Sequence, residues 1–110
     1  MKVTSGDVIT VDFPGTLETK RRPAVVVSTD TFHSTRPDAV LALLTSQTSG
    51  TTGPTDYLLR DWSKAGLRRP SAFRVFLATV PATSITLIGH LSDHDWQEVQ
   101  TRLRIALAVP

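Results

Sequence analysis

The chain has 110 residues, the size of one domain, which is too short for a two-halved dinucleotide-binding fold or a TIM barrel. Apolar residues make up 40% of it, enough for one compact core, but no run of 18 apolar residues predicts a membrane-spanning helix. No basic segment followed by an apolar one predicts a signal peptide, and without cysteine there is no disulfide, cysteine-ligated zinc or cysteine nucleophile. We therefore expect one cytoplasmic domain over residues 1–110, with no membrane association.

Arginine dominates the positive charge. Lysine and arginine total 12 against 10 acidic residues, which gives a net charge of +2 and a sequence pI near 9.5. Nine of the 12 are arginines, whose planar guanidinium binds phosphate through two parallel hydrogen bonds. They gather at Arg21-Arg22, at Arg68-Arg69, and at Arg102 with Arg104. Because the net charge is small, a solvated basic surface explains these clusters as well as nucleic-acid binding does.

The first quarter of the chain predicts two strands. Residues 7–13 alternate apolar and other residues between Gly6-Asp7 and Pro14-Gly15, which predicts a strand with one buried face. The polar residues 16–21 predict a loop. A second strand is expected at 23–28, with proline first, where no ladder donor is needed, and three successive valines that indicate burial on both faces.

The middle of the chain alternates polar and apolar segments. Residues 29–38 are polar and end in a Pro-Asp turn, and an apolar strand is expected at 39–44. The Thr-, Ser- and Gly-rich segment 45–54 predicts a loop. A short edge strand is expected at 55–60, and 61–66 is typical of one helical turn closed by glycine.

The last third predicts two strands and a helix. The strands are expected at 71–77 and within 85–91. Residues 92–108 predict an amphipathic helix with Ser92 as N-cap and Asp95 three residues on. Its apolar residues recur at helical spacing, at Trp96, Val99, Leu103, Ala106 and Leu107. Strands spaced by turns with one terminal helix predict a mainly β fold, a small, strongly curved antiparallel sheet or barrel with a C-terminal α-helix.

Motifs of familiar catalysts are missing from the sequence, which has no GxSxG, Walker A, HExxH or GxGxxG. His90, Asp93, His94 and Asp95 lie close in sequence, but acidic residues in a first helical turn complement the helix dipole, and no recognised spacing supplies another ligand. His33 is expected to be solvated in its loop. We therefore expect neither a metal nor a cofactor.

Polar residues at two predicted strand ends suggest a site. Arg22 directly precedes one apolar strand, and Thr45 directly follows another. If these strands are antiparallel neighbours, both residues share one rim of the sheet with Glu18 and the Ser46-Gln47-Thr48 segment. A cation and a hydroxyl there could stabilise charge on a phosphoryl oxygen. The ordinary alternative is an exposed arginine and a threonine that caps backbone groups.

Five blocks of the sequence resemble the MazF/PemK-type toxins of toxin–antitoxin pairs. Gly6–Phe13 and Lys20–Ser28 are similar to the opening of that family. The resemblance continues through Ala39–Thr48, Leu67–Ser71 and Ile88–Ser92, so it spans almost the whole chain in order. It implies a small SH3-like barrel with a C-terminal helix, working as a homodimer.

The resemblance also implies an activity and its residues. The implied activity is sequence-specific, metal-independent cleavage of single-stranded RNA, often mRNA, in which the ribose 2′-hydroxyl attacks the adjacent phosphorus. The products would carry a 2′,3′-cyclic phosphate and a 5′-hydroxyl, and an acidic antitoxin protein would cover the same basic groove. The family's catalytic residues fall on Arg22, Thr45 and, in the first loop, Glu18. Contacts to RNA are expected from Thr16, Lys20, Arg21, Ser46, Gln47 and Thr48.

Two segments depart from the family pattern. The loop before Arg22 is slightly shorter than in many relatives. Residues 73–79 are more apolar than in many relatives, and we expect this to alter either the RNA groove or the dimer contact. Three other functions stay open: a non-catalytic toxin acting by protein contact, as gyrase-poisoning relatives of this fold do; an RNA-binding barrel without catalysis; and a protein-interaction domain.

Overall fold

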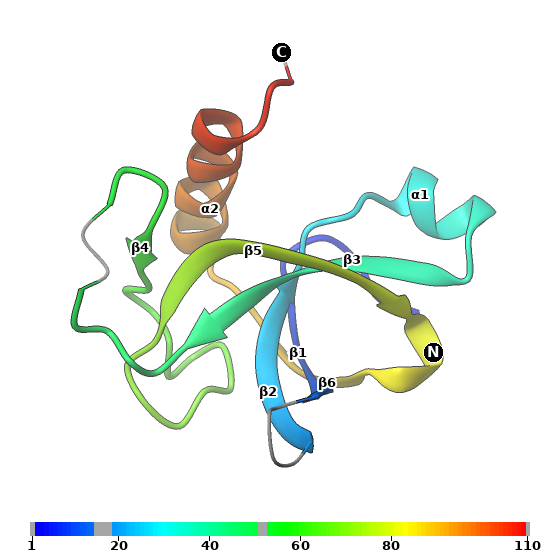
Figure 1. The fold of residues 1–110 in the computed structure, drawn as a ribbon, viewed down its shortest axis with the longest axis horizontal. Coiled ribbons are helices and arrows are strands. Elements are labelled where there is room, and N and C mark those ends of the chain that lie inside the picture. Colours follow the sequence, from blue (N-terminus) through cyan, green and yellow to red (C-terminus); the bar gives the residue numbers. More distant parts are fainter. Residues whose placement is uncertain (1, 15–18, 51–52, 110) are drawn as a thin grey trace.

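The protein folds as one curled, six-stranded antiparallel sheet with a helix at its end (Figure 1). The computed structural model describes residues 2–14, 19–50 and 53–109. In chain order the elements are β1 (Asp7–Pro14), β2 (Thr19–Val26), α1 (Asp30–Thr35), β3 (Asp38–Thr45), β4 (Tyr57–Leu58), β5 (Ala72–Pro81), the 3-10 helix η1 (Ala82–Ser84), β6 (Thr86–His90) and α2 (Asp93–Ala106). The strand order is β4-β5-β3-β2-β1-β6, and α2 lies against β4 and β5. The predicted fold class is confirmed.

The curl of the sheet encloses apolar side chains on both of its faces. One cluster, here called the helix-side core, contains Val8, Val25, Ala42, Leu44, Phe73, Leu91 and Val99. The other, the far-side core, contains Val3, Ile9, Val11, Ala24, Val26, Leu41 and Ile85. Burial of 23–28 on both faces is therefore confirmed. The one-faced prediction for β1 is wrong, since Val8 and Ile9 are both fully buried, in opposite cores.

Several predicted boundaries are also wrong. The expected loop 16–21 overlaps β2, which begins at Thr19, so Pro23 is mid-strand and pairs with Thr10. Pro23 nevertheless precedes Ala24, the first residue of β2 paired with β3, so its missing N–H leaves that ladder intact. The polar segment 29–38 contains α1, because the Thr29 hydroxyl accepts from the backbone N–H of Phe32 and caps a short helix.

The terminal helix begins as predicted but ends its packing early. The Ser92 hydroxyl accepts from the Asp95 N–H at 3.2 Å, which confirms the N-cap. Trp96, Val99 and Leu103 pack on the helix-side core as expected. Ala106 and Leu107 are instead exposed, because the helix ends at Ala106 beyond the elements it packs against.

Two glycines let the segment before β5 lie directly against β6. Gly66 has φ of +90°, and a Cβ placed there would lie 2.4 Å from the carbonyl oxygen of Ile88. A Cβ on Gly89 would lie 2.0 Å from the carbonyl oxygen of Ala65. The glycine of the predicted 61–66 turn is thus confirmed as a left-handed residue, and its contact fixes the position of the residues that follow it.

A buried carboxylate holds the other end of the same segment. Asp95, fully buried on α2, accepts hydrogen bonds from the Tyr57 hydroxyl at 2.6 Å and from the backbone N–H groups of Arg60 at 3.0 Å and Asp61 at 2.8 Å. The sequence placed Asp95 only as a first-turn residue. In the fold it joins α2 to the chain that leaves β4, and a charged acceptor with three donors is a strong tie.

Substitution of Gly89 by alanine should destabilise the protein. The added methyl group would meet backbone rather than a flexible side chain, so we expect a loss of at least about 2 kcal/mol in the free energy of unfolding. Gly53→Ala is the control, since its Cβ would meet only the tip of the Asp56 side chain at 3.2 Å. Urea titration of both variants checks this, and equal stability of the two would contradict the close approach.

The single tyrosine should resist ionisation while the protein stays folded. Burial, and then the hydrogen bond to Asp95, raise the pKa of Tyr57 well above its usual value of about 10. Because the fold favours the neutral phenol, the free energy of unfolding should fall as pH rises above that usual value. Ultraviolet absorbance should show phenolate only together with unfolding, whereas the urea-unfolded chain ionises near 10. Phenolate in a still folded chain near pH 10 would disprove this environment.

Candidate functional site

The rim where β3 ends at Thr45, beside the middle of β2, carries the residues singled out in the sequence. Arg22 lies within β2 rather than before it, which corrects the prediction. The two strands are antiparallel neighbours, with Ala24 paired to Leu43. Continuing this register by two residues sets Arg22 opposite Thr45. On its other side Arg22 pairs with Val11 of β1, a residue of the far-side core. Strand alternation therefore gives Arg22 and Thr45 the same face of the sheet.

The side chains at this rim differ in how they are held. Arg22 is exposed, and in the described part of the chain no hydrogen bond or ion pair engages its guanidinium. Thr45 is half-buried, and its hydroxyl oxygen accepts from the Gln47 N–H at 3.1 Å. That bond is the backbone cap that the ordinary alternative proposed. It leaves the hydroxyl proton of Thr45 available for another acceptor.

The remaining predicted residues are distributed around the same rim. Lys20, Ser46 and Gln47 are exposed and Thr48 is half-buried. Thr16 and Glu18 lie outside the described residues. Within the described ranges, no three His, Cys, Asp or Glu side chains gather as metal ligands would.

On the opposite face of the rim lies a groove of about 550 Å³. It is lined by Thr10, Arg21, Pro23, Ser46, Gly66, Leu67, Arg68, Arg69, Ser71 and Ile88. Arg21 and Ser46 are the chain neighbours of Arg22 and Thr45, so alternation along the strands puts the two pairs on opposite faces. One rim therefore presents basic residues and hydroxyl groups on both faces.

The groove contains two arginines that the sequence did not connect with the predicted site. Arg68 and Arg69 form one of the arginine clusters, but only the fold shows that the 59–71 segment returns to the rim. The informative signal in the sequence was the glycine at position 66, whose contact with β6 fixes the segment. Arg21, in contrast, already donates to Asp12 at 3.0 Å and to the Thr86 hydroxyl at 2.5 Å.

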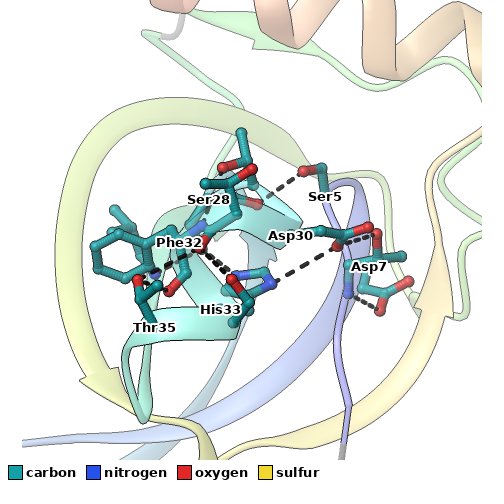
Figure 2. A network of polar contacts seen from close by, with 12 residues as sticks. Ser5, Asp7, Ser28, Asp30, Phe32, His33 and Thr35 are labelled. Atoms are coloured by element: carbon teal, nitrogen blue, oxygen red, sulfur yellow. Dashed lines mark hydrogen bonds and ion pairs between the residues drawn. The ribbon is translucent and has the colours of Figure 1, made fainter.

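A second polar cluster lies around α1 (Figure 2). It adjoins the start of β3, whereas the rim lies at the end of that strand. The Ser28 hydroxyl oxygen lies 2.5 Å from Nε2 of His33 and also accepts from the Val40 N–H at 3.0 Å. His33 thus lies half-buried on α1 and contacts Ser28, which follows β2, rather than being solvated in a loop, which corrects the prediction. Asp30 on α1 accepts from the Thr4 hydroxyl at 3.0 Å. The cluster fixes α1 and the N-terminal segment to the sheet.

The histidine near the end of β6 also has a structural partner. His90 Nδ1 lies 2.8 Å from Oδ1 of Asp7, whose other oxygen accepts from the Thr4 N–H at 2.9 Å. These contacts join the start of β1 to β6. His90 and Asp7 are therefore accounted for by packing of the two strands.

Solved structures share this fold over nearly the whole chain. An endoribonuclease in complex with its cognate antitoxin, from a mycobacterial species, superposes with a TM-score of 0.79 at 20% identity over 99% of this chain and 98% of that one. A MazE–MazF structure from Deinococcus radiodurans gives 0.77 at 18% identity over 100% and 99%. The Mycobacterium tuberculosis toxin MazF-mt6 gives 0.75 at 16% over 94% and 98%. A comparison with curated proteins gives no match.

Two findings complete the description. In the part of the chain that the structure describes, no helix is long and apolar enough to cross a membrane. The family model described as the PemK-like, MazF-like toxin of type II toxin–antitoxin systems matches residues 4–107, almost the full length of the sequence. The chain therefore belongs to the PemK/MazF-like toxin family of type II toxin–antitoxin systems.

Proposed function

We propose that this chain is the RNA-cleaving toxin of its pair, a sequence-specific endoribonuclease that acts on single-stranded RNA, including mRNA, without a metal ion. The observation that carries the proposal is the pairing of β2 with β3, whose register sets Arg22 opposite Thr45 on one face of the rim. An exposed guanidinium beside a hydroxyl suits a phosphodiester. Similarity to solved endoribonucleases supports the same activity.

The proposed reaction is an internal transfer at phosphorus. The ribose 2′-oxygen forms a bond to the adjacent phosphorus, and the bond from phosphorus to the 5′-oxygen of the next nucleotide breaks. The 2′-hydroxyl loses its proton and the leaving 5′-oxygen gains one, which yields a 2′,3′-cyclic phosphate and a 5′-hydroxyl. Negative charge builds on the non-bridging oxygens, where Arg22 would stabilise it and the Thr45 hydroxyl would donate a hydrogen bond.

The reaction also needs an acceptor for the proton of the 2′-hydroxyl. Glu18 on the first loop, a substrate group or water could each serve as the general base. Lys20, Arg21, Ser46, Gln47 and Thr16 would hold the RNA on either side of the scissile phosphate, together with Thr48. A protein of this activity would work in the cytoplasm, where mRNA is found.

The proposed partners follow from the family and from the surface. Relatives were crystallised with their cognate antitoxins, and an acidic antitoxin segment would fit the arginines at this rim. We also propose a homodimer. Large apolar side chains that are exposed in the single chain include Phe76 at 64%, Ile105 at 57% and Leu87 at 46%. Phe76 belongs to the apolar segment 73–79, which would then act at the contact between protomers.

Arg22→Ala should abolish most of the cleavage. Because the guanidinium stabilises charge only as the transition state forms, we expect kcat on single-stranded RNA to fall by at least about a hundredfold. Thr45→Ala should lower kcat as well. The assay measures cleavage of a mixed-sequence RNA with EDTA present, and Arg104→Ala, which removes an exposed arginine on α2, is the control.

Ordinary turnover by Arg22→Ala would refute the catalytic assignment. RNA binding without cleavage by the wild-type protein would instead favour a non-catalytic RNA-binding barrel. A folded protein that neither binds nor cleaves RNA would favour a toxin that acts by protein contact.

A further inference from the structure

We infer that Arg68 and Arg69 form a phosphate-binding subsite for the RNA segment that flanks the scissile phosphate, reached over the rim from Arg22 and Thr45. The inference rests on the proposed function, because it takes RNA as the ligand. It adds a binding role for a segment between β4 and β5 that lies far in sequence from the predicted site.

The first support is the chemistry of the groove. Three arginines line it, and none of its ten lining residues is acidic. Arg68 and Arg69 are exposed, and across the described ranges no hydrogen bond or ion pair holds their guanidinium groups. Such groups bind phosphate oxygens in pairs of parallel hydrogen bonds. The hydroxyls of Ser46 and Ser71 add donors and acceptors suited to ribose and phosphate.

The second support is that the backbone that carries the two arginines is held in place before any ligand arrives. Close backbone contacts at Gly66 and Gly89 hold the segment before Arg68 against β6. At the beginning of that segment, the backbone N–H groups of Arg60 and Asp61 donate hydrogen bonds to Asp95 of α2. Leu67, between Gly66 and Arg68, is buried in the helix-side core. A backbone fixed on both sides lowers the entropy lost on binding.

The third support is continuity with the rim. Arg21 and Ser46 line the groove, and each is the direct chain neighbour of a residue in the proposed active site. An RNA strand that crosses the rim would therefore pass Arg22 first, then Arg21, and then Arg68 and Arg69. Ile88, which is 37% exposed, adds apolar surface to the groove, against which a base can lie. An acidic peptide would also bind the arginines, but its binding does not require them to continue from the proposed active site along the rim.

The test compares two variants that each lose two positive charges. Arg68→Gln/Arg69→Gln removes the subsite, and Arg36→Gln/Arg104→Gln removes two exposed arginines from α1's C-cap and from α2. The probe is a labelled, mixed-sequence single-stranded RNA with 2′-O-methyl riboses, which cannot supply the attacking hydroxyl. Binding is measured over a series of salt concentrations, and thermal unfolding checks that both variants are folded.

The subsite variant should bind roughly tenfold or more weakly than wild type. Its plot of log affinity against log salt should be shallower by about 1.4, the value for two lost phosphate contacts on a single strand. The control variant Arg36→Gln/Arg104→Gln should show smaller changes in both the affinity and the salt slope. Arg68→Lys/Arg69→Lys should recover most of the salt slope, because it keeps the charge while losing the planar fork.

Three results would overturn the inference. The first is wild-type affinity and slope in Arg68→Gln/Arg69→Gln. The second is loss of binding to poly-L-glutamate with RNA binding intact, which assigns the arginines to an acidic protein partner. The third is a wild-type protein that binds no RNA, which overturns the proposed function too. If the wild-type protein binds the probe but cleaves no RNA, only the proposed function is overturned. The salt slope of Arg68→Gln/Arg69→Gln then still decides whether the subsite exists.

Discussion

The pairing of β2 with both of its neighbours organises the molecule. On one side, β1 pairs antiparallel with β2 along its length, from the pair Val8 and Val25 to the pair Pro14 and Thr19. On the other side, β3 pairs only with the last residues of β2, from Ala24 to Val26. The pairing of β2 with β3 ends at Ala24, near the rim. From Pro23 back to Thr19, the neighbour that the structure describes for β2 is β1. The arginines at positions 21 and 22 lie on this part of β2. The sheet there has two accessible faces, and consecutive residues divide between them.

This division separates two tasks at one edge. Arg22 and Thr45 belong to the far-side face, where a single cation and hydroxyl suit chemistry at one phosphate. Arg21 and Ser46 belong to the helix-side face, where Arg68 and Arg69 extend the basic surface. On that face, the close contacts of Gly66 and Gly89 and the hydrogen bonds of Asp95 hold the segment that carries Arg68 and Arg69. Packing far from the rim therefore determines how far the proposed RNA-binding surface extends.

The sequence predicted the strands and the helix better than their ends. Alternation and valine runs found β1, β2 and β3, and Ser92 found the start of α2, because these signals are local. The start of β2 was missed because Lys20 and Arg21 are polar, yet strand pairing with Phe13 and Asp12 overrides that. Arg22 and Thr45 could be placed at one rim in advance, because the start of an antiparallel strand faces the end of its neighbour. Their position opposite each other came only from the observed register of β2 and β3. The hydrogen bonds of Asp95 and the position of Arg68 and Arg69 in the groove could not be predicted, since both depend on contacts between segments distant in sequence.

In the proposed reaction, the ribose 2′-hydroxyl of the RNA is the nucleophile at the Arg22–Thr45 rim. The most direct measurement first maps the cleavage site, then replaces only the ribose on the 5′ side of the scissile phosphate by 2′-deoxyribose, with EDTA present. We predict that the all-ribose RNA is cut to a 2′,3′-cyclic phosphate and a 5′-hydroxyl, and that the substituted RNA binds equally well but stays intact. Cleavage of the substituted RNA at the same phosphate, or a 5′-phosphate product, would contradict the account.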